Sequence, residues 1–474
     1  MQHGSSESAP PAIFIYLSSF DDLGLCDQVL QATQELGYET PTPIQAQAIP
    51  KVLAGQDVLG VAQTGTGKTA AFSLPMINRL HLERYSGQQR PIRGLILTPT
   101  RELAAQIEEN IIGYTKHVKL FSVTLFGGVS QHGQVQKLRR GVDIVVATPG
   151  RLLDLQEQGF VNLNHLQYFV LDEADTMMDM GFIHDLRRII KHLPRDRQSL
   201  FFSATMPPNI LEFASTMLRD PERVEVAPES TAAETVDQSL LFVNQGDKRD
   251  LLVHLLKQEE VETALVFTRT KYGADKVVRF LNRSKIKAEA IHGNKTQPQR
   301  ERAMKAFKSG KLNVLVATDI AARGIDVSGV SHVINYEIPN ISETYVHRIG
   351  RTGRAGASGV AWSLVNEDDE RKHMADIQRL MDRKVPVMTD QPWHNGLEEI
   401  ELDRGRGTGQ GNRRSQEGGD RTAKKKPGRK KKPFNKRYKP GGGSGSGGSG
   451  DGSSFGGNRH KKPSKKRNNG GGRP

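Results

Sequence analysis

A glycine-rich segment of eight residues has the residue types and spacing of a phosphate-binding loop. It reads Ala62-Gln63-Thr64-Gly65-Thr66-Gly67-Lys68-Thr69, with alanine in place of the usual first glycine, and it lies between an apolar run and a helical pattern that starts at Ala70. Gly65 and Gly67 let backbone N–H groups close around phosphate oxygens, and the N-terminus of the following helix favours an anion. Lys68 is placed to hold the β- and γ-phosphates of a nucleotide, and the Thr69 hydroxyl to ligate Mg²⁺.

Two carboxylates follow an apolar run further along the chain. Asp172 and Glu173 come directly after residues 168–171, which have the character of a buried strand. In this position Asp172 would reach Mg²⁺ and Glu173 would orient or deprotonate an attacking water. An isolated Asp-Glu pair is most often solvated surface, but the phosphate loop about 100 residues upstream favours the catalytic interpretation.

A third candidate group is cationic. Residues 347–354 contain Arg348, Arg351 and Arg354 and no acid. Guanidinium forks match phosphate geometry, and a positive charge stabilises the charge that develops on a transferred γ-phosphoryl group. The alternative is a solvated basic turn. If these arginines reach a nucleotide held by the first half of the chain, the site is complete only when two domains close.

The elements that must position these groups alternate between short apolar runs and longer helical patterns. This alternation is typical of parallel α/β architecture, and near-continuous apolar runs suit strands that are covered on both faces. Polar or glycine residues follow nearly every run, so ligands are expected beyond the carboxyl ends of the strands. The expected strands are 57–62, 94–98, 143–147, 168–171, 200–202, 264–267, 314–317 and 332–336.

The pattern predicts two similar α/β domains of the parallel-sheet type. Residues 227–234 are polar and lack large apolar groups, which is typical of a hinge. The expected organisation is a flexible N-terminal extension over 1–17, domain 1 over 18–226, a flexible linker over 227–235, domain 2 over 236–385, and a low-complexity basic tail over 386–474.

The net charge of +14 over 474 residues lies in the tail. Residues 404–474 carry 22 Lys and Arg against three acids, whereas residues 1–403 carry 45 basic and 50 acidic groups. The segment has no Ile, Leu, Val or Met and 20 of the 48 glycines, so it cannot bury enough apolar surface to fold and is expected to be disordered. A flexible polycation with interspersed aromatics, Phe434, Tyr438 and Phe455, suits a nucleic acid. A solubilising tail without a dedicated target is the alternative.

Other classes of protein are excluded by composition. No run approaches the roughly 18 apolar residues of a membrane-spanning helix, so no membrane partner is expected. The single cysteine, Cys26, rules out an internal disulfide and a cysteine-based metal site. We therefore interpret the chain as an intracellular, cytoplasmic protein.

The motifs together resemble those of the DEAD-box ATP-dependent RNA helicases, most similarly the bacterial RhlE-type members. The resemblance covers roughly residues 18–385, and the motifs stand in the family's order. They are residues 37–45, the phosphate loop, 99–104, Gly127-Gly128, 148–151, Asp172-Glu173-Ala174-Asp175, Ser203-Ala204-Thr205, 266–270, 297–300, 317–326 and 347–354. The family implies two RecA-like domains and an alanine at the start of the phosphate loop.

The resemblance also implies roles for single residues. Gln45 would read the adenine edge, which favours ATP over GTP, with Phe20 and Tyr38 as aromatic neighbours of the base. Asp326 would contact the nucleotide from the second domain, with Arg351 and Arg354 as arginine fingers. Ser203 and Thr205 would couple the nucleotide site to the RNA site. The expected RNA contacts are Pro99, Arg101, Gly128, Thr148 and Arg151 in the first domain and Thr270, Arg300 and Thr318 in the second.

The expected activity is RNA-stimulated ATP hydrolysis with Mg²⁺, coupled to local, non-processive unwinding of RNA duplexes or remodelling of RNA–protein complexes. Backbone contacts dominate, so little sequence specificity is expected. A DNA-directed translocase, an ATP-dependent RNA clamp and an RNA-annealing scaffold are the alternatives, and the intact Glu173, Arg351 and Arg354 disfavour the non-catalytic ones. Ribosomal precursors and the RNA-decay machinery are candidate partners, and the sequence does not choose between them.

Overall fold

The computed structural model describes residues 19–63, 65–85, 87, 89–226, 236–322, 327, 329–353, 359–366 and 369–400. The predicted N-terminal extension, the linker over 227–235 and residues 401–474 of the predicted tail lie outside these ranges, so the statements about them stay predictions. We call residues 19–226 lobe 1 and residues 236–400 lobe 2.

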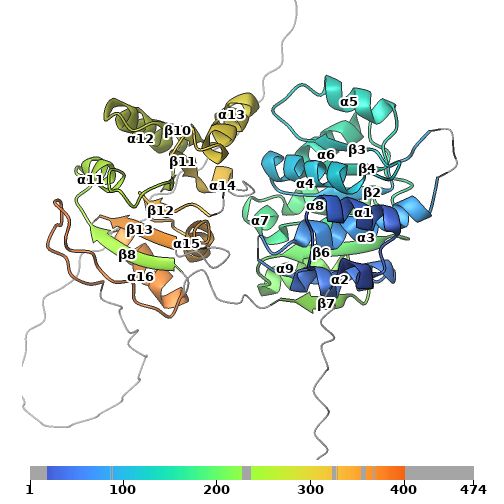
Figure 1. Cartoon of the computed structure of the whole chain (residues 1–474), viewed down its shortest axis with the longest axis horizontal. Coiled ribbons are helices and arrows are strands. Elements are labelled where there is room, and N and C mark those ends of the chain that lie inside the picture. The colour runs from blue at the N-terminus through green and yellow to red at the C-terminus, as the bar shows by residue number, and fades with distance from the viewer. Residues whose placement is uncertain are drawn as a thin grey trace, which may run out of the picture. The chain divides into compact units, whose positions relative to one another are not determined.

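Lobe 1 is built on a seven-stranded parallel sheet in the order β3-β4-β2-β5-β6-β1-β7 (Figure 1). Its strands are β1 Val58–Val61, β2 Gly94–Leu97, β3 Ser122–Leu125, β4 Ile144–Ala147, β5 Tyr168–Leu171, β6 Gln198–Ser203 and β7 Glu222–Glu225. Its helices are η1 Phe20–Leu23, α1 Asp27–Glu35, α2 Pro43–Leu53, α3 Lys68–Leu82, α4 Arg101–Tyr114, α5 His132–Arg139, α6 Pro149–Glu157, α7 Ala174–Asp179, α8 Ile183–Lys191 and α9 Pro208–Ser215.

Lobe 2 is built on a six-stranded parallel sheet in the order β10-β11-β9-β12-β13-β8. Its strands are β8 Val236–Phe242, β9 Ala264–Thr268, β10 Ala288–Ile291, β11 Val314–Thr318, β12 His332–Asn335 and β13 Gly359–Val365. Its helices are α11 Lys248–Leu255, α12 Lys271–Arg283, α13 Gln297–Lys308, α14 Asp319–Ala322, α15 Ser342–Ile349 and α16 Asp369–Leu380.

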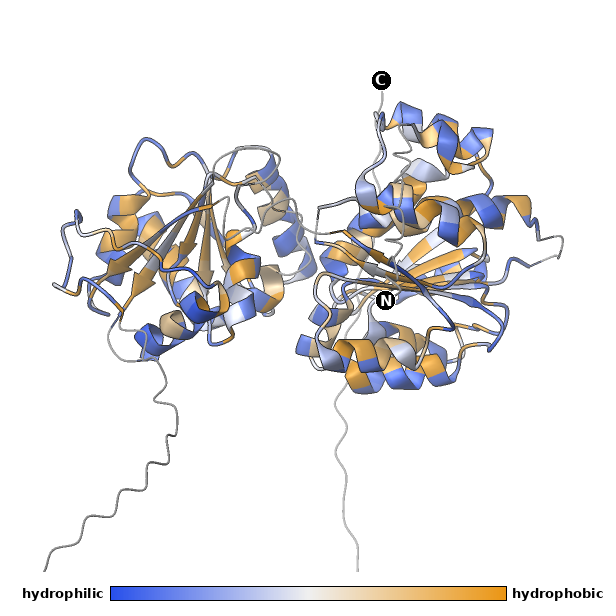
Figure 2. Cartoon of the chain, turned by 90° about the horizontal axis from the view of Figure 1, so that it is seen from below, coloured by the Kyte–Doolittle hydropathy of each residue, from blue (hydrophilic) through white to orange (hydrophobic). Residues whose placement is uncertain are grey.

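Both faces of each sheet are buried. Successive side chains of a strand point to opposite faces, so they belong to two different cores. In β2, Ile96 packs into the core with α2, α3 and α4, whereas Leu95 and Leu97 pack into the core with α6, α8 and α9. The apolar strands run between helices whose hydrophobic sides face the sheet (Figure 2). The prediction of two parallel-sheet α/β units is therefore confirmed. Among the described residues, no helix is long and apolar enough to cross a bilayer.

The prediction that the tail begins at residue 386 is wrong, because residues 386–400 pack on lobe 2. Leu240 N of the edge strand β8 donates to Pro386 O (2.8 Å), and Met388 N donates to Leu240 O (2.8 Å). Further on, Gln391 Nε2 donates to Phe242 O (3.1 Å), and the Ile400 side chain is buried. This segment, which we call the edge segment, supplies hydrogen-bond partners to an edge strand and apolar side chains to the core.

Candidate nucleotide and RNA sites

The phosphate loop joins β1 to α3 in the predicted strand–loop–helix arrangement. Gly65 (φ 90°) and Gly67 (φ 93°) adopt left-handed backbone angles, which residues with a Cβ atom rarely adopt. Lys68 opens α3, and its buried ammonium donates to Ala62 O at 2.8 Å, so it lies across the loop. The N-terminus of α3, the two glycines and the lysine thus form a site for an anion. Thr66 Oγ1 closes the loop by donating to Gln63 O (2.7 Å).

Gln45 connects helix α2 to the phosphate loop. Its Oε1 accepts from Thr42 N (2.9 Å) at the start of α2, and its Nε2 donates to Gly67 O (3.2 Å). A Cβ at position 67 would collide with the Gln45 amide, which is a second reason for glycine there. The residue predicted to read the base is therefore buried, and it links α2 to the predicted phosphate loop through hydrogen bonds.

Two predicted adenine-side aromatics lie next to each other. The ring centroids of Phe20 and Tyr38 are 5.8 Å apart, and the Tyr38 hydroxyl is 2.9 Å from that of Tyr114. Burial raises the pKa of Tyr114. Phe20 is 4% exposed and packs into the core, so its ring supports Tyr38.

Asp172 and Glu173 lie at the carboxyl end of β5, as predicted, and both are buried. Burial raises the pKa of Asp172 to about 7, against the opposing charge of Lys68. Burial likewise raises the pKa of Glu173, while the charges of Lys68 and Arg351 oppose the shift. Glu173 has a left-handed backbone (φ 52°), and its Oε2 has no hydrogen-bond partner in the described part of the chain. A strained backbone and an unpaired buried oxygen both cost folding free energy. The catalytic role of Glu173 stays a prediction.

Asp175 joins the loops after β5 and β6, and the sequence analysis assigned no role to it. Its Oδ2 accepts from Ala204 N (3.1 Å), Thr205 N (2.9 Å) and Thr205 Oγ1 (3.1 Å), and its own N–H donates to Ser203 Oγ (3.4 Å). Strands β5 and β6 are parallel neighbours, so their following loops meet at the same edge of the sheet. Ser203 and Thr205 are therefore joined to the carboxylate loop directly.

The five predicted RNA residues of lobe 1 follow three adjacent strands. Pro99 and Arg101 follow β2, Gly128 follows β3, and Thr148 and Arg151 follow β4. Gly128 has a φ of 76°, and a Cβ there would overlap the Arg101 guanidinium.

The loop after β3 is also held from its other side by Arg151. This guanidinium donates from Nη1 to Gln134 Oε1 (3.2 Å) and from Nη2 to Val129 O (3.4 Å). Together with Arg101 at Gly128, it fixes the loop and leaves arginine charge beside it. The structure thus brings the five predicted residues to one edge of the sheet.

In lobe 2 the predicted RNA residues also gather at the strand ends. Thr270 caps α12 after β9 by accepting from Gly273 N (3.0 Å), and Thr318 ends the neighbouring β11. Arg300, on α13, lies 3.5 Å from Ala321 O, and its Nη2 lies 3.0 Å from Glu102 Oε2 in lobe 1. Burial lowers the pKa of Arg300, against the charge of Glu102.

Arg348 is 1% exposed, and each of its guanidinium nitrogens has a hydrogen-bond partner. Its Nε and Nη2 hold Asp319 at 2.5 and 2.8 Å, and its Nη1 donates to Asn335 Oδ1 (3.0 Å) and Glu337 O (2.7 Å). An acid distant in sequence therefore neutralises it. Arg351 is 8% exposed and contributes positive charge at Glu173.

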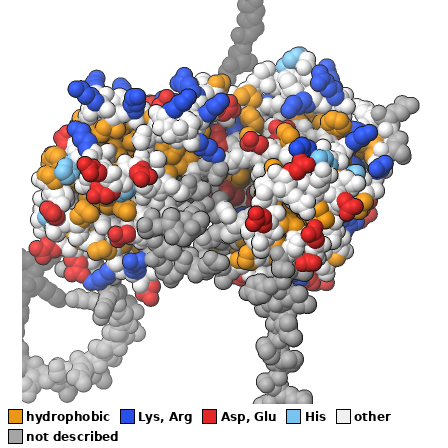
Figure 3. All heavy atoms as spheres, in the orientation of Figure 1, with side chains coloured by type: hydrophobic (Ala, Val, Ile, Leu, Met, Phe, Trp, Pro, Cys, Tyr) orange, Lys and Arg blue, Asp and Glu red, His pale blue; other side chains and the backbone are white. Residues whose placement is uncertain are grey.

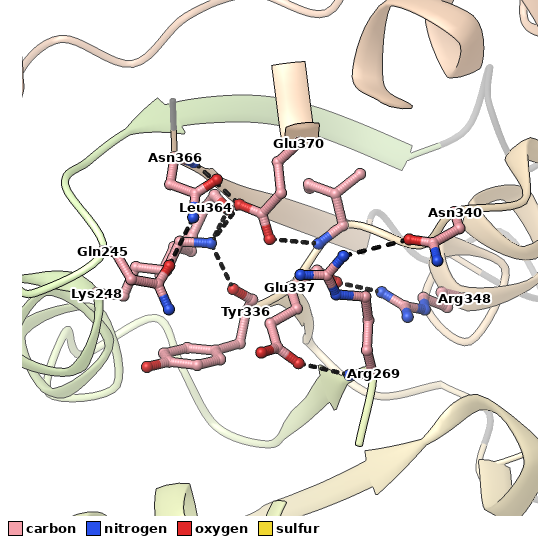
Figure 4. A network of polar contacts seen from close by, with 11 residues as sticks. Gln245, Lys248, Arg269, Tyr336, Glu337, Asn340, Arg348, Leu364, Asn366 and Glu370 are labelled. Atoms are coloured by element: carbon pink, nitrogen blue, oxygen red, sulfur yellow. Dashed lines mark hydrogen bonds and ion pairs between the residues drawn. The ribbon is translucent and has the colours of Figure 1, made fainter. Parts of the chain in front are cut away.

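A buried ion pair between Lys248 and Glu370 holds residues 336–338, which follow β12 (Figure 4). Lys248 Nζ donates to Glu370 Oε2 (2.5 Å), Tyr336 O (3.0 Å) and Leu364 O (2.9 Å), and Glu370 Oε1 accepts from Ile338 N (3.3 Å). Burial lowers the pKa of Lys248, against the opposing charge of Glu370.

The same segment reaches the loop that precedes α12. Glu337 Oε2 accepts from Arg269 N (2.6 Å), next to Thr270 (Figure 4). The sequence analysis missed Lys248, Glu337 and Glu370, because they stand far apart in the chain and in no phosphate-like pattern. Thr64, Asp326 and Arg354 lie outside the described residues.

Comparisons with known proteins agree with this geometry. The DEAD/DEAH box helicase model matches residues 42–213, and the helicase conserved C-terminal domain matches residues 247–356. The chain is 41% identical to the DEAD-box ATP-dependent RNA helicase CshA of Geobacillus kaustophilus over 81% of this chain and 80% of that protein. It is 42% identical to RhpA of Helicobacter pylori over 78% of this chain and 74% of that protein.

A solved structure, S. cerevisiae Dbp5 bound to RNA and ADP BeF3, resembles the chain with a TM-score of 0.69 and 31% identity, over 78% of this chain and 95% of that one. The two sheets are therefore RecA-like, as predicted. Assignment to the RhlE-type members stays a prediction. On sequence, fold and motif geometry, the chain belongs to the DEAD-box family of ATP-dependent RNA helicases.

Proposed function

We propose that the protein is an RNA-stimulated ATPase that uses ATP for local, non-processive unwinding of RNA duplexes or remodelling of RNA–protein complexes. The observation that carries the proposal is the bond between Asp175 and Thr205, because it joins the loop of the hydrolytic carboxylates to the Ser203–Thr205 loop. A change at the nucleotide is thereby transmitted to a neighbouring strand end through two direct hydrogen bonds.

The nucleotide binds at the phosphate loop of lobe 1 in this proposal. Backbone N–H groups of residues 65–69 and the helix N-terminus receive the phosphates, and Lys68 exchanges Ala62 O for the β- and γ-phosphate oxygens. Gln45 contacts adenine beside Tyr38 while it keeps α2 and the loop together. Lobe 2 contributes Asp326 and the arginine fingers Arg351 and Arg354.

The residues present fit Mg²⁺, which the family uses with ATP. Thr69 and Asp172 would hold it, and two buried carboxylates with raised pKa values are groups that a divalent cation stabilises in their charged form. When bound, the ion neutralises phosphate charge. Glu173, whose Oε2 has no partner among the described residues, accepts the proton of the attacking water.

RNA is bound through its backbone by the two sets of strand-end residues. Arg101 and Arg151 supply charge in lobe 1, Arg300 supplies it in lobe 2, and the threonines 148, 270 and 318 supply hydroxyls. If ATP and RNA each favour the closed arrangement of the lobes, each must tighten the binding of the other by the same factor. A strand held in a bent form excludes its complement, and hydrolysis releases it. The cytoplasm is the proposed compartment, since ATP and RNA are both present there.

The test is the steady-state ATPase rate with RNA and with DNA of the same sequence. We expect strong stimulation by RNA and little by DNA, because the 2′-hydroxyl distinguishes them. Glu173→Gln is the matched control: it should bind ATP and RNA yet hydrolyse at least about 100-fold more slowly. A rate that is indifferent to RNA contradicts the proposal, and equal stimulation by DNA favours a DNA-directed translocase.

A further inference from the structure

A groove lies along the β10 edge of lobe 2. It has a volume of about 480 Å³ and follows strand β10, which ends its sheet, between helices α12 and α13. Its floor contains the small side chains of Ala288 and Ala290, and Asn282 and Gln299 lie on its two helical walls. The site is open and polar, which suits an extended, hydrated ligand better than a small apolar one.

The rim of this groove is cationic. Lys287, Arg302 and Lys311 line it with exposed side chains, and they make no ion pair with a described carboxylate. Glu289 is the acid that lines it, and Lys295 at its far end is paired with Asp275 (2.8 Å). Three unneutralised charges around one groove, against one acid, indicate an anionic ligand.

Within residues 1–403, an excess of positive charge is found in the part that contains the groove, residues 271–312. Residues 271–312 carry 12 Lys and Arg and three acids, whereas the other residues of 1–403 carry 33 Lys and Arg and 47 acids. Lys and Arg side chains gather over α12 and α13 in the surface view (Figure 3). A cationic face on an otherwise acidic body is the electrostatic pattern of a nucleic-acid contact.

The groove is continuous with the RNA contacts proposed for lobe 2. Gln299 and Arg302, which line it, stand on α13 directly beside Arg300, which faces the strand ends. An RNA strand that extends beyond Arg300 can pass Lys295 and enter the groove. There it would contact Arg302 and then Lys287 and Lys311. Helix α13 therefore separates two contact surfaces of the same ligand.

We infer that this groove binds the phosphate backbone of RNA that flanks the segment held at the strand ends. The inference rests on the RNA binding proposed above and adds a second, sequence-independent contact surface on lobe 2. Its role is to hold the single strand or duplex next to the point of unwinding. An acidic peptide that pairs with the open edge of β10 would use the same charges, but it would not require the continuity with Arg300.

The first experiment compares RNAs of two lengths on the full chain. The triple variant Lys287→Gln, Arg302→Gln, Lys311→Gln should bind an RNA of about 30 nucleotides more weakly, with a salt slope smaller by about three, one for each lost phosphate contact. Binding of an RNA of about 10 nucleotides, and the ATPase rate at saturation with it, should be unchanged.

The matched control removes the same charge from exposed residues before the amino end of β6, with Arg187→Gln, Lys191→Gln, Arg195→Gln. It should leave both RNAs unaffected. Equal losses for the long and short RNAs, or no loss for either, would overturn the inference. Loss of ATPase stimulation by the short RNA in the unmodified chain would instead contradict the proposed function itself.

A second experiment locates the contact independently of the basic tail. RNA carrying 4-thiouridine outside its central 10 nucleotides is photocrosslinked to the full chain, and the attached peptides are identified. Crosslinks within residues 282–312 support the inference, and crosslinks confined to residues 401–474 refute it. Polyglutamate that binds the unmodified chain but not the triple variant, with RNA binding equal in both, would assign the groove to an acidic protein instead.

Discussion

Asp175 accepts hydrogen bonds from both the backbone N–H and the hydroxyl of Thr205, at 2.9 and 3.1 Å. The two residues stand at the ends of adjacent strands β5 and β6, and the bonds are charge-assisted. They join the loop that carries Asp172 and Glu173 to the loop that follows β6. Nucleotide-dependent movement of either loop must therefore involve the other.

Thr205→Val should separate hydrolysis from unwinding. The variant keeps the backbone bond to Asp175 and loses the hydroxyl bond, so ATP binding should persist while unwinding per ATP hydrolysed falls several-fold. Asp175→Asn should impair both, because a buried charge-assisted acceptor is worth about 1.5–3 kcal/mol. ATPase and strand-displacement assays on the same preparations give the ratio. Asp196→Asn, an exposed acid of lobe 1, is the control, and an unchanged ratio in Thr205→Val contradicts the coupling role.

Asp172 should make the ligand-free protein less stable as the pH rises. Its pKa lies at about 7 in the folded chain, against an ordinary value of 3.8, so the folded state retains a proton that the unfolded state releases. The stabilisation is full below about pH 4 and is lost as the pH rises through about 7.

Thermal unfolding of the wild-type protein and of Asp172→Asn measures this effect. The variant should be the more stable of the two at about pH 8, and the difference should shrink at about pH 5 and on addition of Mg²⁺. A difference that does not depend on pH would show that Asp172 titrates normally.

Lys248→Met should destabilise lobe 2 strongly. It leaves the Glu370 carboxylate buried without its cation, which costs about 3–5 kcal/mol. In the double variant Lys248→Met, Glu370→Gln, the amide oxygen can still accept from Ile338 N, so we expect more than half of the stability to return. Denaturant unfolding measures both. Equal losses in the single and double variants would mean that packing rather than charge dominates.

Truncation should distinguish the edge segment from the tail. A chain ending at Asp403 should keep its RNA-stimulated ATPase and bind RNA more weakly, with a flatter salt dependence, because it lacks the 22 basic residues beyond it. A chain ending at Val385 should also lose stability, since the partners of Leu240 and Phe242 and the buried Ile400 are gone. Equal stability of the two truncated chains contradicts a structural role for residues 386–400.

Sequence patterns located most interior strands, but neither the edge strands nor the interior strand β13. Residues 168–171 form β5 as predicted, and 264–267 form β9 to within one residue, because strands covered on both faces are continuously apolar. The edge strands β3, β7, β8 and β10 and the interior strand β13 were missed: β3 alternates between buried and partly buried positions, and β10 carries Glu289. A criterion based on apolar runs does not detect such strands.

The candidate site was predictable where its motifs are local. The phosphate loop and the carboxylates follow β1 and β5 as expected, since the chemistry of each is contained in a few consecutive residues. Asp175 was not assigned, because its partners stand 28 to 30 residues further along. Residues 386–400 were assigned to the tail because their apolar side chains are scattered between prolines and follow no helical or strand period.

The edge segment has a practical consequence for the modular construction of such enzymes. Because it supplies hydrogen-bond partners to β8 and the buried Ile400 side chain, lobe 2 needs the residues up to Ile400. An appendage from another helicase, or a fluorescent or affinity domain, should therefore be joined beyond Ile400 and not at residue 386. A graft made at residue 386 would remove the partners of Leu240 and Phe242 and the buried Ile400, whereas one made beyond Ile400 would keep them.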